Sequence, residues 1–150
     1  MGGLTSILYH HRLIGLDTSI FIYHIQADSR FSPLATTVLE SVSQGICQGV
    51  TPLLTLMELA VKPLQVGRPD LADEYEIFVS NIPHLDLVRL ERPVMRRAAL
   101  LRAQHRLRPA DSLQLAACLE HGATAFFTND KRLRRLTETE IVVLDDFLDD

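Results

Sequence analysis

Residues 13–19 read LIGLDTS, a short apolar run that ends in an aspartate and two hydroxyl residues. A short apolar run of this kind is typical of a strand that is buried in a parallel sheet. Residues 125–130, AFFTND, repeat the arrangement, again with an aspartate after the apolar run. The two stretches predict two buried strands, each followed directly by polar side chains.

The rest of the chain alternates strand-like runs with helical patterns. Together with 13–16 and 125–128, the predicted strands are 46–51, 85–90 and 141–144. Apolar spacing and prolines in first turns predict helices over 19–26, 33–44, 53–65, 69–81, 93–105 and 109–121. Pro63 is expected to weaken the last turn of its helix. This alternation predicts an α/β fold of three layers, α/β/α, with a parallel sheet of about five strands flanked by helices.

Length and composition favour one globular domain over residues 1–150, because 47% of the residues are hydrophobic and 23% are charged. Two cysteines, Cys47 and Cys118, are too few for a disulfide framework or a cysteine-rich zinc site, so we interpret both as core residues. No apolar run approaches the ~20 residues of a membrane span, and no signal-peptide cleavage pattern is present. We therefore expect a cytoplasmic protein without a membrane partner.

The net charge of −4 conceals a basic segment. Residues 89–135 carry 11 basic and 4 acidic side chains, whereas residues 136–150 carry 6 acidic ones and no basic one. Binding of nucleic acid depends on a local basic surface, so the acidic total does not exclude it. Solvated helix faces would give the same counts. The acidic end, 145–150, is compatible with a short helix, a strand end or a solubilising tail.

Four carboxylates stand where a parallel sheet would gather them. Asp17 and Asp130 directly follow predicted strands, Asp111 opens the helix before the strand at 125–128, and Glu58 lies inside an apolar helical stretch. Ligands of such sheets bind outside the carboxyl ends of the strands. Each aspartate also has a structural explanation as a helix cap or a first-turn charge. Glu58 either faces solvent or needs a partner, because burying a lone charge is costly.

The joint arrangement predicts a cation site. Clustered carboxylates repel one another unless they share protons or bind a cation, and oxygen-only ligands suit Mg²⁺ or Mn²⁺. Such a site can activate water and neutralise the charge of a phosphoryl group. The six histidines form no i, i+4 pair, and no glycine-rich phosphate loop is present.

Four segments in this order resemble the PIN domain, and most closely the toxin ribonucleases of bacterial VapBC toxin–antitoxin pairs. They are LIGLDTS at 13–19, TLMELAV at 55–61, RLRPADSLQLAA at 106–117 and FFTND at 126–130. The resemblance extends from about Leu13 to Leu148. It implies a parallel sheet of about five strands and a ribonuclease that depends on Mg²⁺ or Mn²⁺.

The resemblance also implies roles for individual residues. The candidate catalytic residues are the four acids of the family pattern and the hydroxyl residue before the last of them: Asp17, Glu58, Asp111, Asp130 and Thr128. Asp17, Asp111 and Asp130 would hold the metal directly or through water, and Glu58 would orient a metal ligand or the attacking water. The basic segments of the chain, independently of the resemblance, suggest Arg106, Arg108 and Lys131 as candidate substrate-binding residues, together with Thr18 and Ser19 beside the first acid. Thr18 or Ser19 could also support Asp17 by a hydrogen bond.

Two departures from the family pattern affect the metal geometry, including whether one or two ions bind. Ala110 stands where the family often has Asn, and basic residues fill 131–135, where some members carry a further acid. The family's toxins are usually homodimers inhibited by a small antitoxin, which often places an arginine among the carboxylates. RNA, an antitoxin and a second copy of the chain are therefore the implied partners.

Two other functions fit the same residues. A non-catalytic PIN-like module would use the acids only to bind a partner's arginine. Another Mg²⁺-dependent phosphoryl-transfer enzyme, of the receiver or haloacid-dehalogenase type, would use Asp17 with Lys131. That enzyme class leaves Glu58 and Asp111 without a role, and Ser19 occupies the second position of the D-x-D pattern that it needs.

Overall fold

The computed structural model describes residues 2–28 and 30–149. Five strands form one parallel sheet in the order β3-β2-β1-β4-β5. The strands are β1 (Leu13–Leu16), β2 (Gln48–Pro52), β3 (Leu85–Val88), β4 (Ala125–Thr128) and β5 (Glu140–Val143). The α-helices are α1 (Gly2–His10), α2 (Thr18–Ile25), α3 (Ser32–Ser43), α4 (Leu54–Gln65), α5 (Pro69–Ser80), α6 (Arg92–His105) and α7 (Pro109–Glu120). Two 3₁₀ helices, η1 (Lys131–Arg135) and η2 (Leu144–Phe147), follow β4 and β5.

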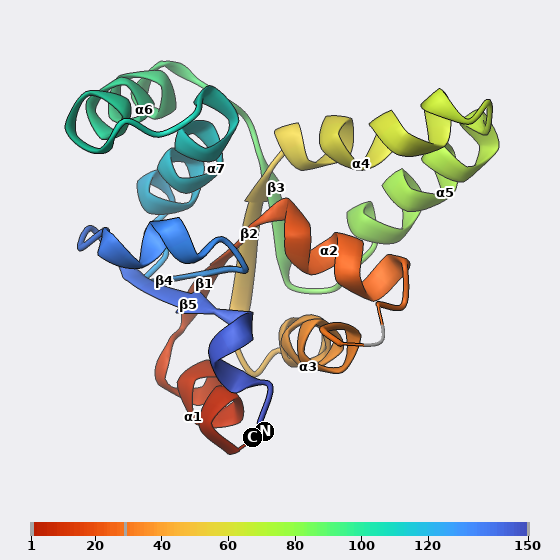
Figure 1. The fold of residues 1–150 in the computed structure, drawn as a ribbon, viewed down its shortest axis with the longest axis horizontal. Helices are drawn as coiled ribbons and strands as arrows, with labels where there is room; N and C mark the ends of the chain where they lie inside the picture. The colour runs from red at the N-terminus through yellow and green to blue at the C-terminus, as the bar shows by residue number, and fades with distance from the viewer. Residues whose placement is uncertain (1, 29, 150) are drawn as a thin grey trace.

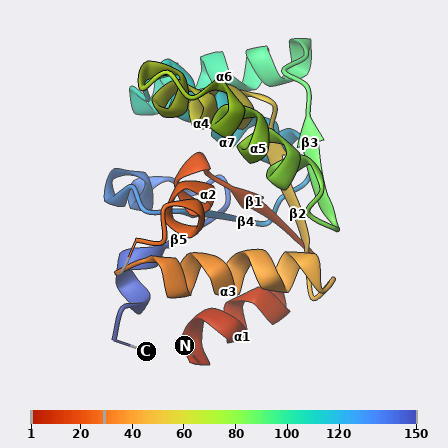
Figure 2. The ribbon, with the colours of Figure 1, turned by 90° about the vertical axis from the view of Figure 1, so that its right-hand side faces the viewer.

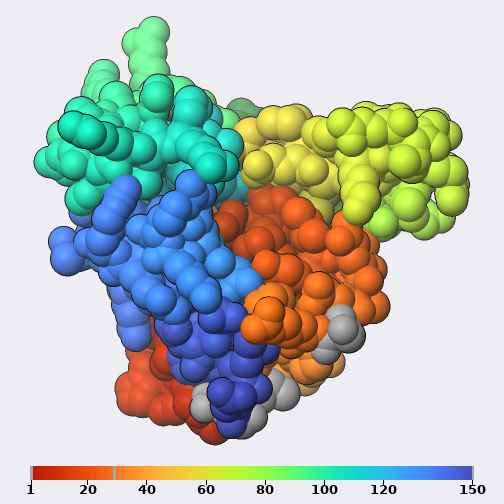
Figure 3. Space-filling model, in the orientation of Figure 1, coloured from red at the N-terminus to blue at the C-terminus, as the bar shows by residue number. Residues whose placement is uncertain are grey.

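Helices cover both faces of the sheet, so the predicted three-layer α/β/α fold is confirmed (Figures 1 and 2). One apolar cluster joins α1, α2 and α3 to one face through residues such as Leu8, Phe21 and Phe127. A second cluster joins α6 and α7 to the other face through residues such as Leu101 and Phe126. Helices α4 and α5 form a hairpin that projects from the side of the molecule (Figure 3).

The predicted elements agree with the structure to within two residues at each end, and the strands 13–16 and 125–128 match residue for residue. Helix α4 continues past Pro63 to Gln65, and Pro63 is buried. Helix α1 was not predicted. It forms because Leu4 and Leu8, one turn apart, are both fully buried against α3 and the sheet. Both cysteines are buried and free, as expected.

The acidic end of the chain forms part of η2 as far as Phe147, and Asp150 lies outside the described residues. Asp145 is held by Lys131, whose Nζ lies 2.8 Å from its Oδ2. Among residues 2–28 and 30–149, no helix is long and apolar enough to cross a membrane.

A close approach of α7 to β1 positions the acids. A Cβ atom on Gly15 would lie 2.7 Å from both the Cβ and the Sγ of Cys118, which is far closer than real Cβ atoms come. Only glycine lets α7 lie this near to the central strand. Asp111 lies in the N-terminal turn of α7, near enough to Asp17 at the carboxyl end of β1 for its charge to raise the pKa of Asp17.

Candidate active site

The sheet has a topological switch point between β1 and β4, where successive connections of the chain lead in opposite directions. The chain passes outward from β1 through β2 to β3, and then crosses to β4 and β5 on the other side. Leu16 pairs with Phe127, so Asp17 and Thr128 leave the sheet side by side. In sheets of this order the crevice at the switch point is the usual place of a ligand.

Thr128 orients Asp17. Its hydroxyl donates to Asp17 Oδ2 at 2.7 Å, and the Ser19 hydroxyl lies 3.4 Å from the same oxygen. Asp17 occupies the N-cap position of α2, but its side chain makes no capping hydrogen bond. The carboxylate is thus directed away from the helix end. The backbone N–H of Asp130 donates to the Thr128 hydroxyl at 3.1 Å, so one threonine connects two of the predicted acids.

Glu58 has partners on two other helices. Thr18 on α2 donates to Glu58 Oε1 at 2.7 Å, and Nε2 of Gln114 on α7 donates to the same oxygen at 2.8 Å. The hydroxyl of Thr55 extends this network, because it lies 3.2 Å from Thr18 Oγ1 and 2.7 Å from Thr51 Oγ1. Glu58 is therefore a half-buried carboxylate that is held in position by hydrogen bonds from α2 and α7.

Gln114 is the centre of this network. Its side chain is 2% exposed, and Nε2 lies 2.7 Å from Thr18 Oγ1 and 3.1 Å from Thr55 Oγ1. Its other amide atom, Oε1, is the one buried side-chain oxygen without a hydrogen-bond partner in the described residues. The sequence analysis missed Gln114. The available signal was its position one turn after Asp111 on the same helix.

The carboxylates influence one another electrostatically. Burial raises the pKa of Asp17 to about 6. The hydrogen bond from Thr128 lowers this pKa, whereas the negative charges of Asp111 and Glu58 raise it further. Burial also raises the pKa of Asp111, with a contribution from the charge of Asp130. The predicted acids therefore form one coupled group at the ends of β1 and β4.

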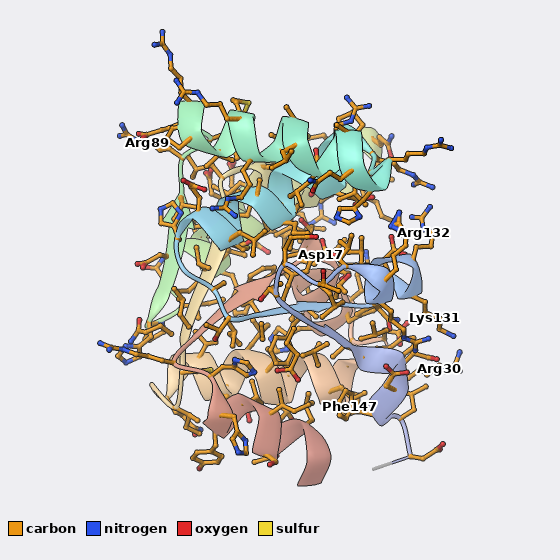
Figure 4. The ribbon with its side chains drawn as sticks, turned by 90° about the vertical axis from the view of Figure 1, so that its left-hand side faces the viewer. Asp17, Arg30, Arg89, Lys131, Arg132 and Phe147 are labelled. Atoms are coloured by element: carbon orange, nitrogen blue, oxygen red, sulfur yellow. The ribbon has the colours of Figure 1, made fainter. Side chains whose placement is uncertain are left out.

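Asp130 is paired with Arg132, an interaction that the sequence analysis did not anticipate. Asp130 Oδ1 accepts from the backbone N and from Nε of Arg132, both at 3.0 Å, and Oδ2 accepts from Nη2 at 2.7 Å. This side-chain hydrogen bonding is the main reason that the pKa of Asp130 lies below its usual value. Figure 4 shows Arg132 on the outer side of the molecule and Asp17 farther inside.

The candidate substrate-binding residues differ in position. Thr18 is buried, and Ser19 is half-buried beside Asp17. Arg106 and Arg108 are exposed at the end of α6 and the start of α7. The charge of Arg108 lowers the pKa of both Asp111 and Asp130, which places it near the acids. Lys131 is exposed, and its amino group is paired with Asp145 rather than with the acid group.

The PIN domain family model matches residues 14–138, which is most of the chain. The chain belongs to the PIN domain family. No protein with a curated description matches it.

Three solved structures resemble this PIN domain over nearly their whole length. VapBC2 from Rickettsia felis, bound to a DNA fragment from their promoter, has a TM-score of 0.67 at 16% identity, covering 86% of this chain and 96% of that one. A toxin-antitoxin complex from Klebsiella pneumoniae has a TM-score of 0.66 at 18% identity, covering 88% and 97%. DNA-bound VapBC from Salmonella typhimurium has a TM-score of 0.67 at 16% identity, covering 89% and 98%. These similarities establish the shared fold.

The donor chemistry of the PIN domain fits a hard divalent cation, because the candidate ligands are all carboxylate oxygens. Within 2–28 and 30–149, however, no three or more His, Cys, Asp or Glu side chains lie close enough together to hold a metal ion. Asp130, one of the three predicted ligands, has both of its oxygens on Arg132. The ligand set Asp17, Asp111 and Asp130 stays a prediction.

A groove between α2, α4 and α5 of the PIN domain is lined by one of the candidate acids, Glu58. Its volume is about 490 Å³, and Glu58, Lys62, Leu59, Ile22 and Tyr75 are among its lining residues. Several apolar side chains on the outer side of α4 are exposed, including Met57 (54%) and Leu64 (54%). This part of the molecule thus presents apolar surface next to a carboxylate.

Proposed function

We propose that this PIN domain is a ribonuclease that hydrolyses RNA phosphodiester bonds with Mg²⁺ or Mn²⁺, and that it is the toxin of a toxin–antitoxin pair in the cytoplasm. The observation that carries the proposal is the electrostatically coupled group of four acids at the switch point of the sheet. Membership of the PIN family supports it.

Asp17, Asp111 and Asp130 would hold the cation, which when bound neutralises phosphate charge and activates water. The protein's own part is to hold these groups in place. Thr128 holds Asp17 by its Oδ2, and Gln114 and Thr18 hold Glu58 by its Oε1. Glu58 would then orient the attacking water or a metal ligand.

Basic residues beside the acids would bind the RNA backbone. Arg106 and Arg108 are exposed above the start of α7, and Ser19 lies at the site itself. Thr18 is buried, so its contribution would be to position Glu58 rather than to touch RNA. Lys131 would reach RNA only by releasing Asp145.

An antitoxin and a second copy of the chain are the proposed protein partners. The similar solved structures are described as toxin–antitoxin or VapBC complexes, which supports the first. The exposed apolar side chains of α4 support an interface of either kind. Light scattering of the purified chain would test the dimer, and arrest of growth on expression of the chain alone would test the toxin.

The decisive experiment is an RNA cleavage assay in Mn²⁺, Mg²⁺ or EDTA. We expect cleavage by the wild type only with metal, and none by the double variant Asp17→Asn/Asp111→Asn. The double variant Asp73→Asn/Asp86→Asn is the matched control, because it removes two exposed acids on α5 and β3. Cleavage that survives in the first variant indicates a contaminating nuclease and removes the support for the proposal.

The non-catalytic module remains the alternative, because Asp130 already holds a guanidinium group. Titration calorimetry separates the two functions. A PIN domain that binds no Mn²⁺ cannot perform this chemistry, and that result would leave the binding module. The receiver-type enzyme has no comparable support, since Lys131 pairs with Asp145.

A further inference from the structure

One basic side chain of η1 pairs with a candidate acid of the site, and the others do not. Arg134 pairs with Asp146, Lys131 pairs with Asp145, and Arg135 donates to the backbone oxygen of His105. Arg132 instead pairs with Asp130, a predicted metal ligand.

The pair with Asp130 is bidentate, and it occupies the oxygens that a cation would need. Nε and Nη2 of Arg132 donate to Oδ1 and Oδ2 at 3.0 Å and 2.7 Å. A planar guanidinium on a carboxylate makes charge-assisted hydrogen bonds of good geometry. With the backbone N–H of Arg132, these bonds take three of the about four acceptor positions of the carboxylate, so a metal ion at Asp130 competes with the guanidinium and repels it.

The Arg132 side chain is free to leave. It is 60% exposed, and Figure 4 shows it on the outer side of the molecule. In residues 2–28 and 30–149 its side chain hydrogen-bonds only to Asp130, so its departure breaks no core contact there.

The charge balance favours an exchange of partners. The candidate acids carry up to four negative charges; Arg108 lies near them, but Arg132 is the positive charge that pairs directly with one of them. A divalent cation at the same place supplies two positive charges and repels the guanidinium. A guanidinium group that pairs with a carboxylate through two nitrogens can pair with a phosphate in the same way. RNA bound at the acidic site would supply such a phosphate.

We propose that Arg132 is the resident counter-cation of the acidic site, and that it exchanges Asp130 for a phosphate of the RNA when the divalent cation binds. This inference rests on the proposed function. It makes Arg132 a substrate-binding residue whose pairing also weakens metal binding by the free protein.

Calorimetric titration with Mn²⁺ tests whether Arg132 competes with the cation for Asp130. Arg132→Ala should bind Mn²⁺ about three- to tenfold more tightly than the wild type at low salt, because no guanidinium competes for Asp130. Arg132→Lys should lie between the two, since an ammonium group cannot pair bidentately. Arg134→Ala is the matched control: it removes the same charge from the same 3₁₀ helix and should bind Mn²⁺ like the wild type.

Binding of adenosine 5′-monophosphate at saturating Mn²⁺ tests whether Arg132 binds a phosphate, because this ligand has a phosphate but no phosphodiester bond. Arg132→Ala should bind it about threefold or more weakly, and Arg134→Ala should not. Equal changes in the two variants, or no change in Arg132→Ala, would overturn the inference and leave the proposed function intact. If neither variant nor the wild type binds Mn²⁺, the proposed function fails together with it.

Discussion

The negative charge of Asp17 destabilises the folded chain when no cation is bound. Its pKa rises from 3.8 to about 6 in the folded protein, so the folded state binds more protons than the unfolded state between these values. The stability that this proton uptake provides is complete below pH 3.8 and is lost as the pH rises to about 6. Acids whose pKa is raised by burial and by neighbouring charges are common at functional sites, which supports the proposed role of Asp17.

Asp17→Asn should therefore stabilise the cation-free protein at neutral pH by up to about 2–3 kcal/mol, less the weakened hydrogen bond from Thr128. The advantage over the wild type should shrink as the pH falls from 7 to 4. Urea unfolding across this range measures it, with exposed Asp86→Asn as the control. A difference that does not depend on pH would contradict the assigned pKa.

Gln114 provides a second test at the scale of single residues. Gln114→Met keeps the shape of the side chain and removes the donor to Glu58, so it should lower the free energy of unfolding by about 1–3 kcal/mol. Gln104→Met on the exposed side of α6 should change it by less than about 0.5 kcal/mol. Equal denaturation midpoints for the two variants would show that the buried amide contributes nothing.

The sequence indicated which acids lie at the site, but it did not indicate which residues hydrogen-bond to them. A glutamate among apolar helical residues needs a partner, but Thr18 and Gln114 are 40 and 56 residues away from Glu58. Nothing local in the sequence encodes such contacts. Arg132 lies only two residues from Asp130, yet the run of neighbouring arginines gave no sign of which one would pair with this acid.

At the scale of elements, the contact of β1 with α7 determines where the acids lie. Gly15→Ala would place a methyl group 2.7 Å from Cys118, and the surrounding atoms that must move include the fully buried Phe126 side chain. We expect a loss of about 1–3 kcal/mol in the free energy of unfolding, and weaker Mn²⁺ binding because Asp111 moves with α7.

Gly2→Ala is the control for this substitution, because no atom lies within 4 Å of the added Cβ position. Chemical denaturation and Mn²⁺ titration of both variants check the prediction. A Gly15→Ala protein as stable as Gly2→Ala would show that α7 does not depend on the glycine.

The elements themselves were predictable where local and tertiary preferences agree. Prolines in first turns and apolar spacing marked α3, α5, α6 and α7 to within one residue. Helix α1 begins with two glycines and is short, so its local sequence favours no helix. Its burial against α3 stabilises it, and the sequence does not show that contact.

At the scale of the whole molecule, the basic residues lie at different distances from the acids. Figure 4 shows Arg89 at the opposite end of the molecule from Arg132. Arg108, by contrast, lies close enough to the acids to lower the pKa of Asp111. The count of 11 basic side chains in 89–135 therefore overstates the surface that faces a substrate at the site.

Arg108→Ala should weaken RNA binding and reduce the slope of log affinity against log salt by roughly 0.7, the value for one contact to a single strand. Arg89→Ala should leave the slope unchanged. Fluorescence anisotropy in EDTA, at several salt concentrations, measures both without cleavage. Equal slopes for the two variants would show that the RNA does not pass over the start of α7.

The pairing of β1 with β4 joins residues that are far apart in the chain: Leu16 lies beside Phe127. During synthesis on a ribosome, β1 can pair with β4 only after most of the polypeptide has been made. Asp130 emerges later still, so a partly translated chain cannot hold all four acids together. Products truncated before β4 lack both the β1–β4 pairing and Asp130, and we expect them not to cleave RNA.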